Sequence, residues 1–327
     1  MGNKKLSIIT INYNNVEGLR KTLASVASQT YKDIEHIIID GGSTDGSVDI
    51  IREYESTIKQ SATIDQSTIQ IKWISEKDNG IYNAMNHGIE IALGHRVVND
   101  DHTSAPNSLN AKRSTLNESH CDYIQILNSG DILAAPDVTE RMFAAMDSLN
   151  AKRSSLNKEA VGILYGNMIR DYGNGKIQRD TTKASGDARE IEWTMDDFIK
   201  GTVNHDPTYI RRDLYEKYGL YDETLKICSD WKWFVNAVVF GGERLYYVPV
   251  DVTIFDTTGI SEKNLAFREQ ERYAELEKML PAAILNDYDT WHFPISQIKR
   301  LKKYHLWGVF YFMERVLFKL EMWRVLR

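Results

Sequence analysis

The first hundred residues alternate between short runs of β-branched residues and longer segments with helical spacing, and this alternation constrains the fold more than any other feature of the chain. The strand-like runs are Leu6–Ile11, Glu35–Asp40 and Ile69–Ile74. The segments with helical spacing are Val16–Ala27, a stretch through Ile50 and Ile51, and Ile81–Leu93. Strands that alternate with helices over short connections predict a mostly parallel sheet with helices on both faces. Ligands of such sheets bind beyond the carboxyl ends of the strands, so polar residues after each strand are the functional candidates.

Acidic residues follow several of these strands. Asp40 comes after the second strand, Asp78 after the third, and Asp131 after the strand-like run Tyr123–Leu127. Carboxylates that converge at one edge of a sheet repel each other unless a cation lies between them. Oxygen ligands with few nitrogens favour Mg²⁺ or Mn²⁺, so a divalent cation is predicted at this edge. The glycines of Gly41–Gly46 lack the spacing of a dinucleotide-binding loop, which disfavours a dehydrogenase.

The charge of the chain excludes some classes of partner. The formal net charge is −6, which argues against a general nucleic-acid-binding protein. Residues 292–327 hold eight Lys and Arg against two Glu, a net charge of +6, so the rest of the chain carries −12. Such an asymmetry predicts that the tail has a partner of its own. The two cysteines, Cys121 and Cys228, are too few for a disulfide framework or a zinc site and predict a reducing cytoplasm.

The polar, aperiodic segment His95–His120 interrupts the alternation and predicts an inserted loop. Its part Ser108–Asn117 recurs as Ser148–Asn157 with a single difference, although two short copies are too few for a repeat architecture. We interpret the two copies as surface insertions, at about residues 95–120 and 148–160. They have no assigned function.

Several short motifs follow one another in order along the chain. They are Thr10–Asn14, Ile39–Gly46, Asp78–Asn86, Leu127–Asp131, Asn204–Thr208, Ser229–Trp231 and Gly259–Ser261. Each is weak alone, but their order and spacing resemble the family 2 glycosyltransferases over about Lys5–Pro281, apart from the two insertions. The resemblance implies the GT-A fold, an α/β domain with a Rossmann-like, mostly parallel sheet flanked by helices. It is nearest to the transferases of bacterial surface-polysaccharide assembly.

The resemblance implies a donor side of the site. The residues that it places there are Thr10, Asn12, Asn14, Asp40, Asp78, Asn83 and Asn128. Asp40 would accept a hydrogen bond from the uracil or the ribose, and Asp78 would make a second contact to the base. Asp131 matches the last acid of the family's metal motif, whose cation bridges the diphosphate. Asn128 and Gly130 stand where many relatives have aspartates, so fewer charges would hold the ion in this chain.

The resemblance also implies the catalytic residues and the reaction. Asp230 matches the general base, and His205 lies near the acceptor and the diphosphate in relatives. A positioned carboxylate takes the proton of the attacking hydroxyl, which contributes about 10²–10⁴-fold, and direct displacement with one base inverts the anomeric centre. The implied function is transfer of a sugar from a nucleoside-diphosphate sugar to a hydroxyl of a glycan or lipid-linked glycan. A UDP-sugar donor is expected from the family.

Simpler structural roles exist for the same residues. Asp230 precedes the helical segment Trp231–Val239 and has the position of an N-cap, as Asp78 has before the segment at Ile81. Asp40 and Asp131 are also suited to start turns. His205 is equally suited to be a structural histidine.

Two alternative functions belong to other classes. One is a non-catalytic module that binds a sugar nucleotide or docks on a membrane, which the presence of both Asp131 and Asp230 disfavours. The other is a sugar nucleotidyltransferase, which usually begins with a Gly-rich, basic phosphate loop. Asn12–Asn14 is not such a loop.

We predict an α/β domain over residues 1–265 and a helical C-terminal extension over residues 266–327. The basic tail carries Trp, Tyr and Phe, which is typical of a helix that docks on an anionic membrane surface. Packing on the domain and a homodimer interface are the alternatives for the tail. The longest apolar run, Leu306–Met313, is far shorter than the roughly 20 residues of a membrane span, and no secretory signal opens the chain. The predicted location is the cytoplasm, at the inner face of the cell membrane.

Overall fold

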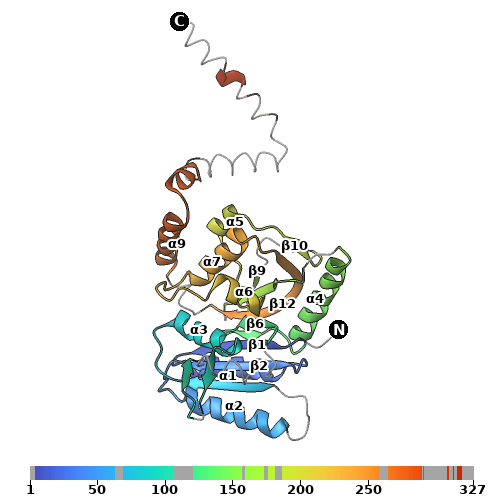
Figure 1. Ribbon diagram of the computed structural model, residues 1–327, viewed down its shortest axis with the longest axis vertical. Helices are drawn as coiled ribbons and strands as arrows, with labels where there is room; N and C mark the ends of the chain where they lie inside the picture. The colour runs from blue at the N-terminus through green and yellow to red at the C-terminus, as the bar shows by residue number, and fades with distance from the viewer. Residues whose placement is uncertain are drawn as a thin grey trace. The chain divides into compact units, whose positions relative to one another are not determined.

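The computed structural model describes residues 4–62, 69–99, 101–106, 121–156, 159–172, 176–180, 186–257, 264–288, 290, 308, 312 and 315–318. The chain forms two compact units, Met1–Arg268 and Glu269–Arg327. The first unit contains a mixed β-sheet with helices around it (Figure 1). The motif Gly259–Ser261, the first copy of the repeated segment and most of the basic tail lie outside the described residues.

The first half of the sheet matches the predicted strands and helices to within one residue at most ends. Its strands are β1 (Leu6–Asn12), β2 (Ile34–Asp40) and β3 (Gln70–Ser75), and its helices are α1 (Val16–Ala27), α2 (Ser47–Ala62) and α3 (Ile81–Ala92). Every residue of β1 and β2 is buried, as expected for parallel strands covered on both faces. The strands pair in parallel, β1 with β2 and β2 with β3. Their carboxyl ends therefore meet at one edge of the sheet.

The second half of the sheet brings in antiparallel strands that the alternation did not predict. The strand order is β10-β12-β8-β11-β6-β1-β2-β3. The strands beyond β1 on this path are β6 (Tyr123–Ile126), β11 (Thr208–Arg211), β8 (Ile163–Asp171), β12 (Leu245–Asp256) and β10 (Arg189–Ile191), and the side strands are β7 (Ile132–Leu133) and β9 (Ile177–Asp180). β6 runs parallel to β1, whereas β11 lies antiparallel between β6 and β8. This placement puts the segment that enters β11 next to the segment that leaves β6.

The helices cover the two faces of the sheet and leave its carboxyl edge for polar residues. α1 and α2 pack on one face through an apolar cluster that includes Leu19, Ile51 and Trp73. α3 covers the other face and approaches β1 closely, since a Cβ on Gly88 would lie 2.3 Å from Cγ2 of Ile9. α4 (Val138–Ser154) runs beside β12 (Figure 1).

Short helices follow in the C-terminal half of the first unit. They are α5 (Met195–Lys200), α6 (Arg212–Tyr218), α7 (Ser229–Phe234) and the π-helix η2 (Val235–Phe240). The predicted helix Trp231–Val239 therefore begins two residues earlier and widens into a π-turn at Val235. The N-cap of α7 is Cys228, so Asp230 lies in the first turn and the N-cap interpretation of Asp230 is wrong. α9 (Leu265–Met279) lies at the start of the predicted helical C-terminal extension.

The segment predicted as an inserted loop is partly a hairpin. β4 (Arg96–Val98) and β5 (Ser104–Pro106) pair antiparallel, which contradicts an aperiodic loop over this part. The hairpin is tied down by polar contacts: Arg96 pairs with Glu90, and the hydroxyl of Ser104 donates to Glu76 at 2.6 Å. These contacts connect it to α3 and to the loop after β3.

The second copy of the repeated segment is not a surface insertion, because it forms the end of α4. Leu149 is buried in the main core cluster. Asn150 accepts a hydrogen bond from the Val161 backbone, and the Arg153 guanidinium lies 4.8 Å from the centre of the Tyr246 ring. Side chains at these helical positions point toward the domain, so this stretch is part of its packing.

No helix among the described residues is both long and apolar enough to span a bilayer. In the tail, the described residues 308, 312 and 315–318 are helical and exposed, and they include Phe312 and Phe318.

Candidate active site

Asp40 lies at the centre of the hydrogen bonds that join the loops after β1, β2 and β3. The Asp40 side chain is fully buried. It accepts hydrogen bonds from Asn12 Nδ2 at 2.8 Å, from the backbone and hydroxyl of Ser43 at 2.9 and 2.6 Å, and from the Ser75 hydroxyl at 2.8 Å. These neutral donors use both oxygens of the carboxylate. Asp40 thus holds these loops together, and its direct contact to uracil or ribose stays a prediction.

Thr10 is placed differently from the prediction. Its side chain is fully buried, and Oγ1 lies 3.0 Å from Nε2 of His36, whose Nδ1 lies 3.0 Å from the Tyr54 hydroxyl. Thr10 therefore points toward α2, into the body of the domain, and does not line a nucleotide pocket. Burial lowers the pKa of His36 to about 3, so this histidine is neutral at physiological pH.

Exposed groups for a nucleotide gather above the loops that Asp40 holds. Asn14 is exposed, has a positive φ of 48° and accepts a hydrogen bond from the Thr44 backbone at 2.8 Å. Tyr13 is 66% exposed. A Cβ on Gly41 would lie 2.5 Å from Asp78 Oδ2 and 3.3 Å from the Tyr13 ring, so Gly41 lets these two side chains come close together. An aromatic face and a carboxylate thus stand side by side at this edge.

The start of α3 holds two further predicted residues. Gly80 is the N-cap of α3, and Asp78 accepts from its backbone at 2.9 Å, so Asp78 forms a turn before the helix and not the cap. Asn83 accepts from the Asn79 backbone at 3.1 Å and donates to Glu223 at 2.9 Å. Asn83 therefore joins α3 to the segment before α7.

The predicted catalytic residues Asp230 and His205 are in contact. Asp230 Oδ2 lies 3.2 Å from His205 Nδ1, and Asp230 Oδ1 accepts from the Tyr82 hydroxyl at 3.1 Å. The Asp230 side chain is 13% exposed, so it is held by the protein yet open to a substrate. The other nitrogen of His205 lies 3.3 Å from Asp206 Oδ1 and 3.1 Å from Asn128 Nδ2.

His205 carries a positive charge in this setting. Burial alone would lower its pKa, but the charges of Asp206 and Asp230 and the hydrogen bonds to both outweigh burial and raise the pKa well above the usual value. With both ring nitrogens facing carboxylates, both donate. The resulting imidazolium bridges Asp206 and Asp230.

Asp131, the predicted metal ligand, lies at the far end of the same chain of contacts. It is only 3% exposed, accepts from the Asp256 backbone at 2.8 Å and lies next to the Asp206 carboxyl group. Burial, and then the charge of Asp206, raise the pKa of Asp131 well above its usual range. The polar chain therefore runs Tyr82–Asp230–His205–Asp206–Asp131, and we use "polar chain" for these five residues.

Sequence reasoning did not single out Asp206 and Tyr82. Asp206 stands beside His205 in a quoted motif, and Tyr82 lies in the motif that opens α3, so only their position within motifs could have drawn attention to them. Asp206 meets Asp131 because β11 lies between β6 and β8. That antiparallel pairing has no local sequence signal.

The side chains around Asp131 can hold a divalent cation only if a bound substrate supplies further ligands. Among the described residues no group of three or more His, Cys, Asp or Glu is arranged to hold a metal ion. Two buried carboxylates, Asp131 and Asp206, nevertheless face each other, and the Asn128 side chain lies beside Asp206 and His205. One or two carboxylates completed by phosphate oxygens and water is the usual way that proteins bind Mg²⁺. A side chain at Gly130 would come within 3.0 Å of Asp256 Oδ2, so a second acid in the motif has little room.

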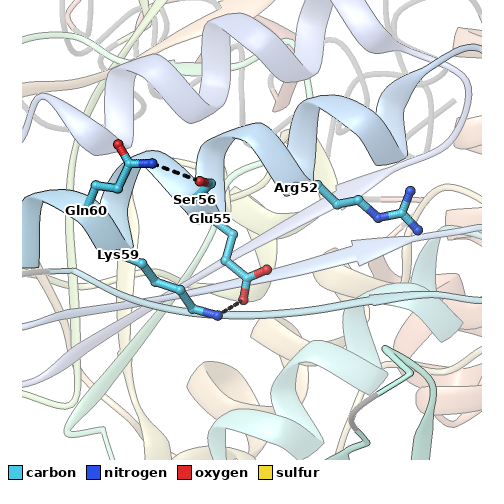
Figure 2. Close-up of a pocket in the computed structure, with 5 residues that line it drawn as sticks. All are labelled: Arg52, Glu55, Ser56, Lys59 and Gln60. Atoms are coloured by element: carbon cyan, nitrogen blue, oxygen red, sulfur yellow. Dashed lines mark hydrogen bonds and ion pairs between the residues drawn. The ribbon is translucent and has the colours of Figure 1, made fainter.

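A hollow on α2 is not part of this site. Figure 2 shows its lining, which comes from one face of the helix: Arg52, Glu55, Ser56, Lys59 and Gln60. Lys59 pairs with Glu55 and Gln60 donates to Ser56, so these groups are turned to one another. None of them is a predicted site residue, and α2 carries no member of the polar chain.

Comparison with known proteins gives the same family that the motifs resemble. The family model described as glycosyl transferase family 2 matches residues 7–111. An uncharacterized glycosyltransferase of Mycobacterium tuberculosis (strain CDC 1551 / Oshkosh) is 27% identical over 287 residues, 84% of this chain and 85% of that protein. A PGL/p-HBAD biosynthesis glycosyltransferase of Mycobacterium bovis (strain BCG / Pasteur 1173P2) is 24% identical over 231 residues, 71% of this chain and 68% of its own. Residues 7–111 thus match glycosyl transferase family 2, and the relatives identify the chain as a glycosyltransferase.

Solved structures share the fold of this glycosyltransferase. S. aureus TarS 1–349 in complex with UDP matches with a TM-score of 0.52 and 15% identity, over 77% of this chain and 60% of that one. The mannosyltransferase PcManGT from Pyrobaculum calidifontis, in complex with GDP-Man and Mn²⁺, matches with a TM-score of 0.51 and 13% identity, over 85% of this chain and 65% of its own. The match with this chain thus covers 60–65% of the length of these two solved chains. The predicted GT-A fold is confirmed.

Proposed function

We propose that this glycosyltransferase is an inverting enzyme that moves a sugar from a nucleoside-diphosphate sugar, with UDP as the expected nucleotide, to a hydroxyl of a glycan or lipid-linked glycan. The observation that carries the proposal is the polar chain. It joins a partly exposed carboxylate, Asp230, to the buried acid Asp131 through an imidazolium and a second carboxylate.

Asp230 is the proposed general base. The His205 cation and the Tyr82 hydroxyl both stabilise its ionised form, and their hydrogen bonds aim the carboxylate. The acceptor oxygen forms a bond to the anomeric carbon while its proton passes to Asp230. The bond from that carbon to the diphosphate oxygen breaks, and the nucleoside diphosphate leaves with the electron pair. A single base with direct displacement inverts the anomeric centre.

The donor is proposed to bind over the loops of β1, β2 and β3. Tyr13 offers an exposed ring for a nucleobase, and the neighbouring Asp78 carboxylate is an acceptor for base or ribose donors. Asn14 extends the same surface. Solved relatives of the fold in complex with UDP, UDP-GlcNAc and GDP-Man support a nucleotide-sugar donor.

Asp131 is the proposed protein ligand for Mg²⁺ or Mn²⁺, with Asp206 beside it and Asn128 on the donor side. The bound ion would neutralise the charge that grows on the leaving diphosphate. Asp206 keeps the His205 imidazolium between this acid and the base, and in the proposed mechanism its positive charge would also stabilise the leaving diphosphate. The complex of PcManGT with Mn²⁺ supports a divalent cation in this fold.

The acceptor is proposed to be presented at a membrane. The name of the M. bovis relative, a PGL/p-HBAD biosynthesis glycosyltransferase, supports a role in making bacterial surface glycans. Residues 266–327 are proposed as a helical extension whose basic, aromatic tail docks on an anionic leaflet at the inner face of the cell membrane. Sedimentation with phosphatidylglycerol vesicles, but not with phosphatidylcholine vesicles, is the expected result, and it should weaken with salt. A change of oligomeric state on tail truncation, without vesicle binding, would point to a homodimer interface in its place.

The function is tested by donor binding followed by product analysis. Thermal unfolding with UDP-, GDP- and dTDP-sugars and Mn²⁺ should show stabilisation by one nucleotide class, because a ligand that binds only the folded state raises its stability. Incubation of that donor with a glycan acceptor should then release the nucleoside diphosphate. Release of pyrophosphate from a nucleoside triphosphate and a sugar phosphate would identify a nucleotidyltransferase and contradict the proposal.

A further inference from the structure

Tyr82 and His205 contact different oxygens of the Asp230 carboxylate. Tyr82 lies in the first turn of α3, is only 5% exposed, and its hydroxyl is 3.1 Å from Asp230 Oδ1. His205 contacts the other oxygen, Oδ2. The two oxygens of the proposed base are thus fixed by side chains from two different parts of the fold.

The direction of the Tyr82 hydrogen bond follows from the chemistry of the two groups. An ionised carboxylate can only accept a hydrogen bond, so the Tyr82 hydroxyl donates to Asp230 Oδ1. Burial, followed by the charge of Asp230, raises the pKa of Tyr82 well above its usual value, so Tyr82 stays a proton donor in a hydrogen bond and does not itself act as the base.

α3 connects this contact to the donor side. The N-cap of the helix is Gly80, in the turn that Asp78 forms, and Tyr82 follows two residues later. A shift of the loop at Asp78 would therefore move Tyr82 relative to Asp230. The same helix thus carries a group for the nucleotide and a group for the base.

We propose that Tyr82 is a positioning residue that orients the Asp230 carboxylate for proton abstraction. This inference rests on the proposed function, in which Asp230 is the general base. Loss of the hydroxyl removes this donor from Oδ1 and so weakens the hold on the orientation of the carboxylate. A hydrogen bond to a charged group contributes about 1.5–3 kcal/mol, so its loss should lower kcat by about 10- to 100-fold.

Tyr221 provides a matched control. It is a buried tyrosine of the same cluster, with its ring centre 5.7 Å from that of Tyr82, and its hydroxyl faces that of Tyr215 at 3.3 Å. Tyr221→Phe removes a buried hydroxyl a short distance away without removing a contact to Asp230. Its cost to folding should resemble that of Tyr82→Phe.

The experiment compares Tyr82→Phe with Tyr221→Phe by kcat, donor KM, rate against pH and thermal unfolding. Tyr82→Phe should lower kcat with little change in donor KM, and should move the acidic limb of the profile to higher pH, because a carboxylate that loses a hydrogen-bond donor holds its proton more tightly. Tyr221→Phe should keep both kcat and the profile near those of the parent. Equal losses in the two variants, or an unchanged profile in Tyr82→Phe, would overturn the proposal.

A double-mutant cycle with Asp230→Asn separates this inference from the function on which it rests. If Tyr82 acts through Asp230, Tyr82→Phe should cause almost no further loss in the Asp230→Asn background. A full additional loss there would show that Tyr82 acts by another route. An Asp230→Asn variant that keeps the parent rate would contradict the proposed base itself, whatever Tyr82 does.

Discussion

Two buried aspartates at the same edge of the sheet have opposite surroundings. Asp40, at the end of β2, receives hydrogen bonds from neutral groups: the Asn12 amide, the Ser43 backbone and hydroxyl, and the Ser75 hydroxyl. Asp131, which follows β6, faces another carboxylate, Asp206. A carboxylate with enough donors is a stable part of a scaffold, whereas two that face each other store repulsion. The comparison indicates that the first half of the edge supports loops and that the second half is built for chemistry.

Two histidines show the same contrast. His36 lies between the hydroxyls of Thr10 and Tyr54, and burial lowers its pKa to about 3. His205 is also largely buried, but it lies between two carboxylates that raise its pKa well above the usual value. Residue type and burial alone therefore do not identify a site. The charge of the neighbours does.

The largest expected effect is the loss of kcat when the proposed base Asp230 is replaced. Asp230→Asn should lower kcat by about 10²–10⁴-fold and leave donor affinity near the parent value, because the amide keeps the size of the side chain but cannot take a proton. Asp230 is not the N-cap of α7, so loss of a cap should not confuse the result. The measurement is kcat on one acceptor, with donor affinity in parallel. A rate within a few-fold of the parent would remove Asp230 as the base and make His205 the next residue to test.

On the scaffold side, Asp40→Asn should mainly affect stability. The amide nitrogen would face the donors of Ser43 or Ser75, leaving buried donors unpaired, at a cost of about 2–4 kcal/mol in the free energy of unfolding. Denaturant unfolding at neutral pH measures the effect. Unchanged stability with a specific loss of donor binding would support the direct nucleotide contact that the family resemblance implies for Asp40.

The same substitution at Asp131 should have the opposite sign. Asp131→Asn removes the repulsion with Asp206, and its amide can donate to that carboxylate while the remaining oxygen still accepts from the Asp256 backbone. The free energy of unfolding should rise by about 1–2 kcal/mol. Metal-dependent binding of the nucleoside-diphosphate donor should be lost at the same time. Retained metal-dependent affinity would contradict the role of Asp131 as a ligand.

Much of the fold follows from the sequence, because the β-branched runs and the helical spacing are local. The bounds of α1 match the predicted Val16–Ala27, and β1 and β2 differ from the prediction by one residue at one end. The π-turn at Val235 and the hairpin at Arg96–Pro106 have no comparable local signal. The end of α4 differs from the predicted surface insertion, because a repeated segment carries no signal for the packing of Leu149 in the core.

The candidate site could be predicted only residue by residue. Motifs place Asp230, His205 and Asp131 in the sequence, but the contact of Asp206 with Asp131 depends on the antiparallel entry of β11. The side-chain direction of Thr10 could not be predicted from the sequence either. In a strand buried on both faces, period-two alternation does not tell which face a polar side chain takes, and Thr10 takes the face of α2.

The effect expected at His36 is absent at neutral pH and appears only in acid. The folded state keeps His36 neutral down to about pH 3, whereas the unfolded chain binds a proton below about pH 6.5, so acid stabilises the unfolded state. Protonation of His36 in the unfolded chain should lower the free energy of unfolding by about 1.4 kcal/mol for each pH unit below pH 6.5. The loss should be about 2 kcal/mol at pH 5 and absent at pH 7.5. His36→Gln keeps polar atoms for Thr10 and Tyr54 but does not titrate, so its unfolding free energy should approach or exceed that of the parent as the pH falls. Exposed His95 gives the matched control, and His95→Gln should keep the parent's pH dependence. Parallel pH profiles for the parent and His36→Gln would show that His36 takes up a proton in the folded state and would weaken the contrast with His205.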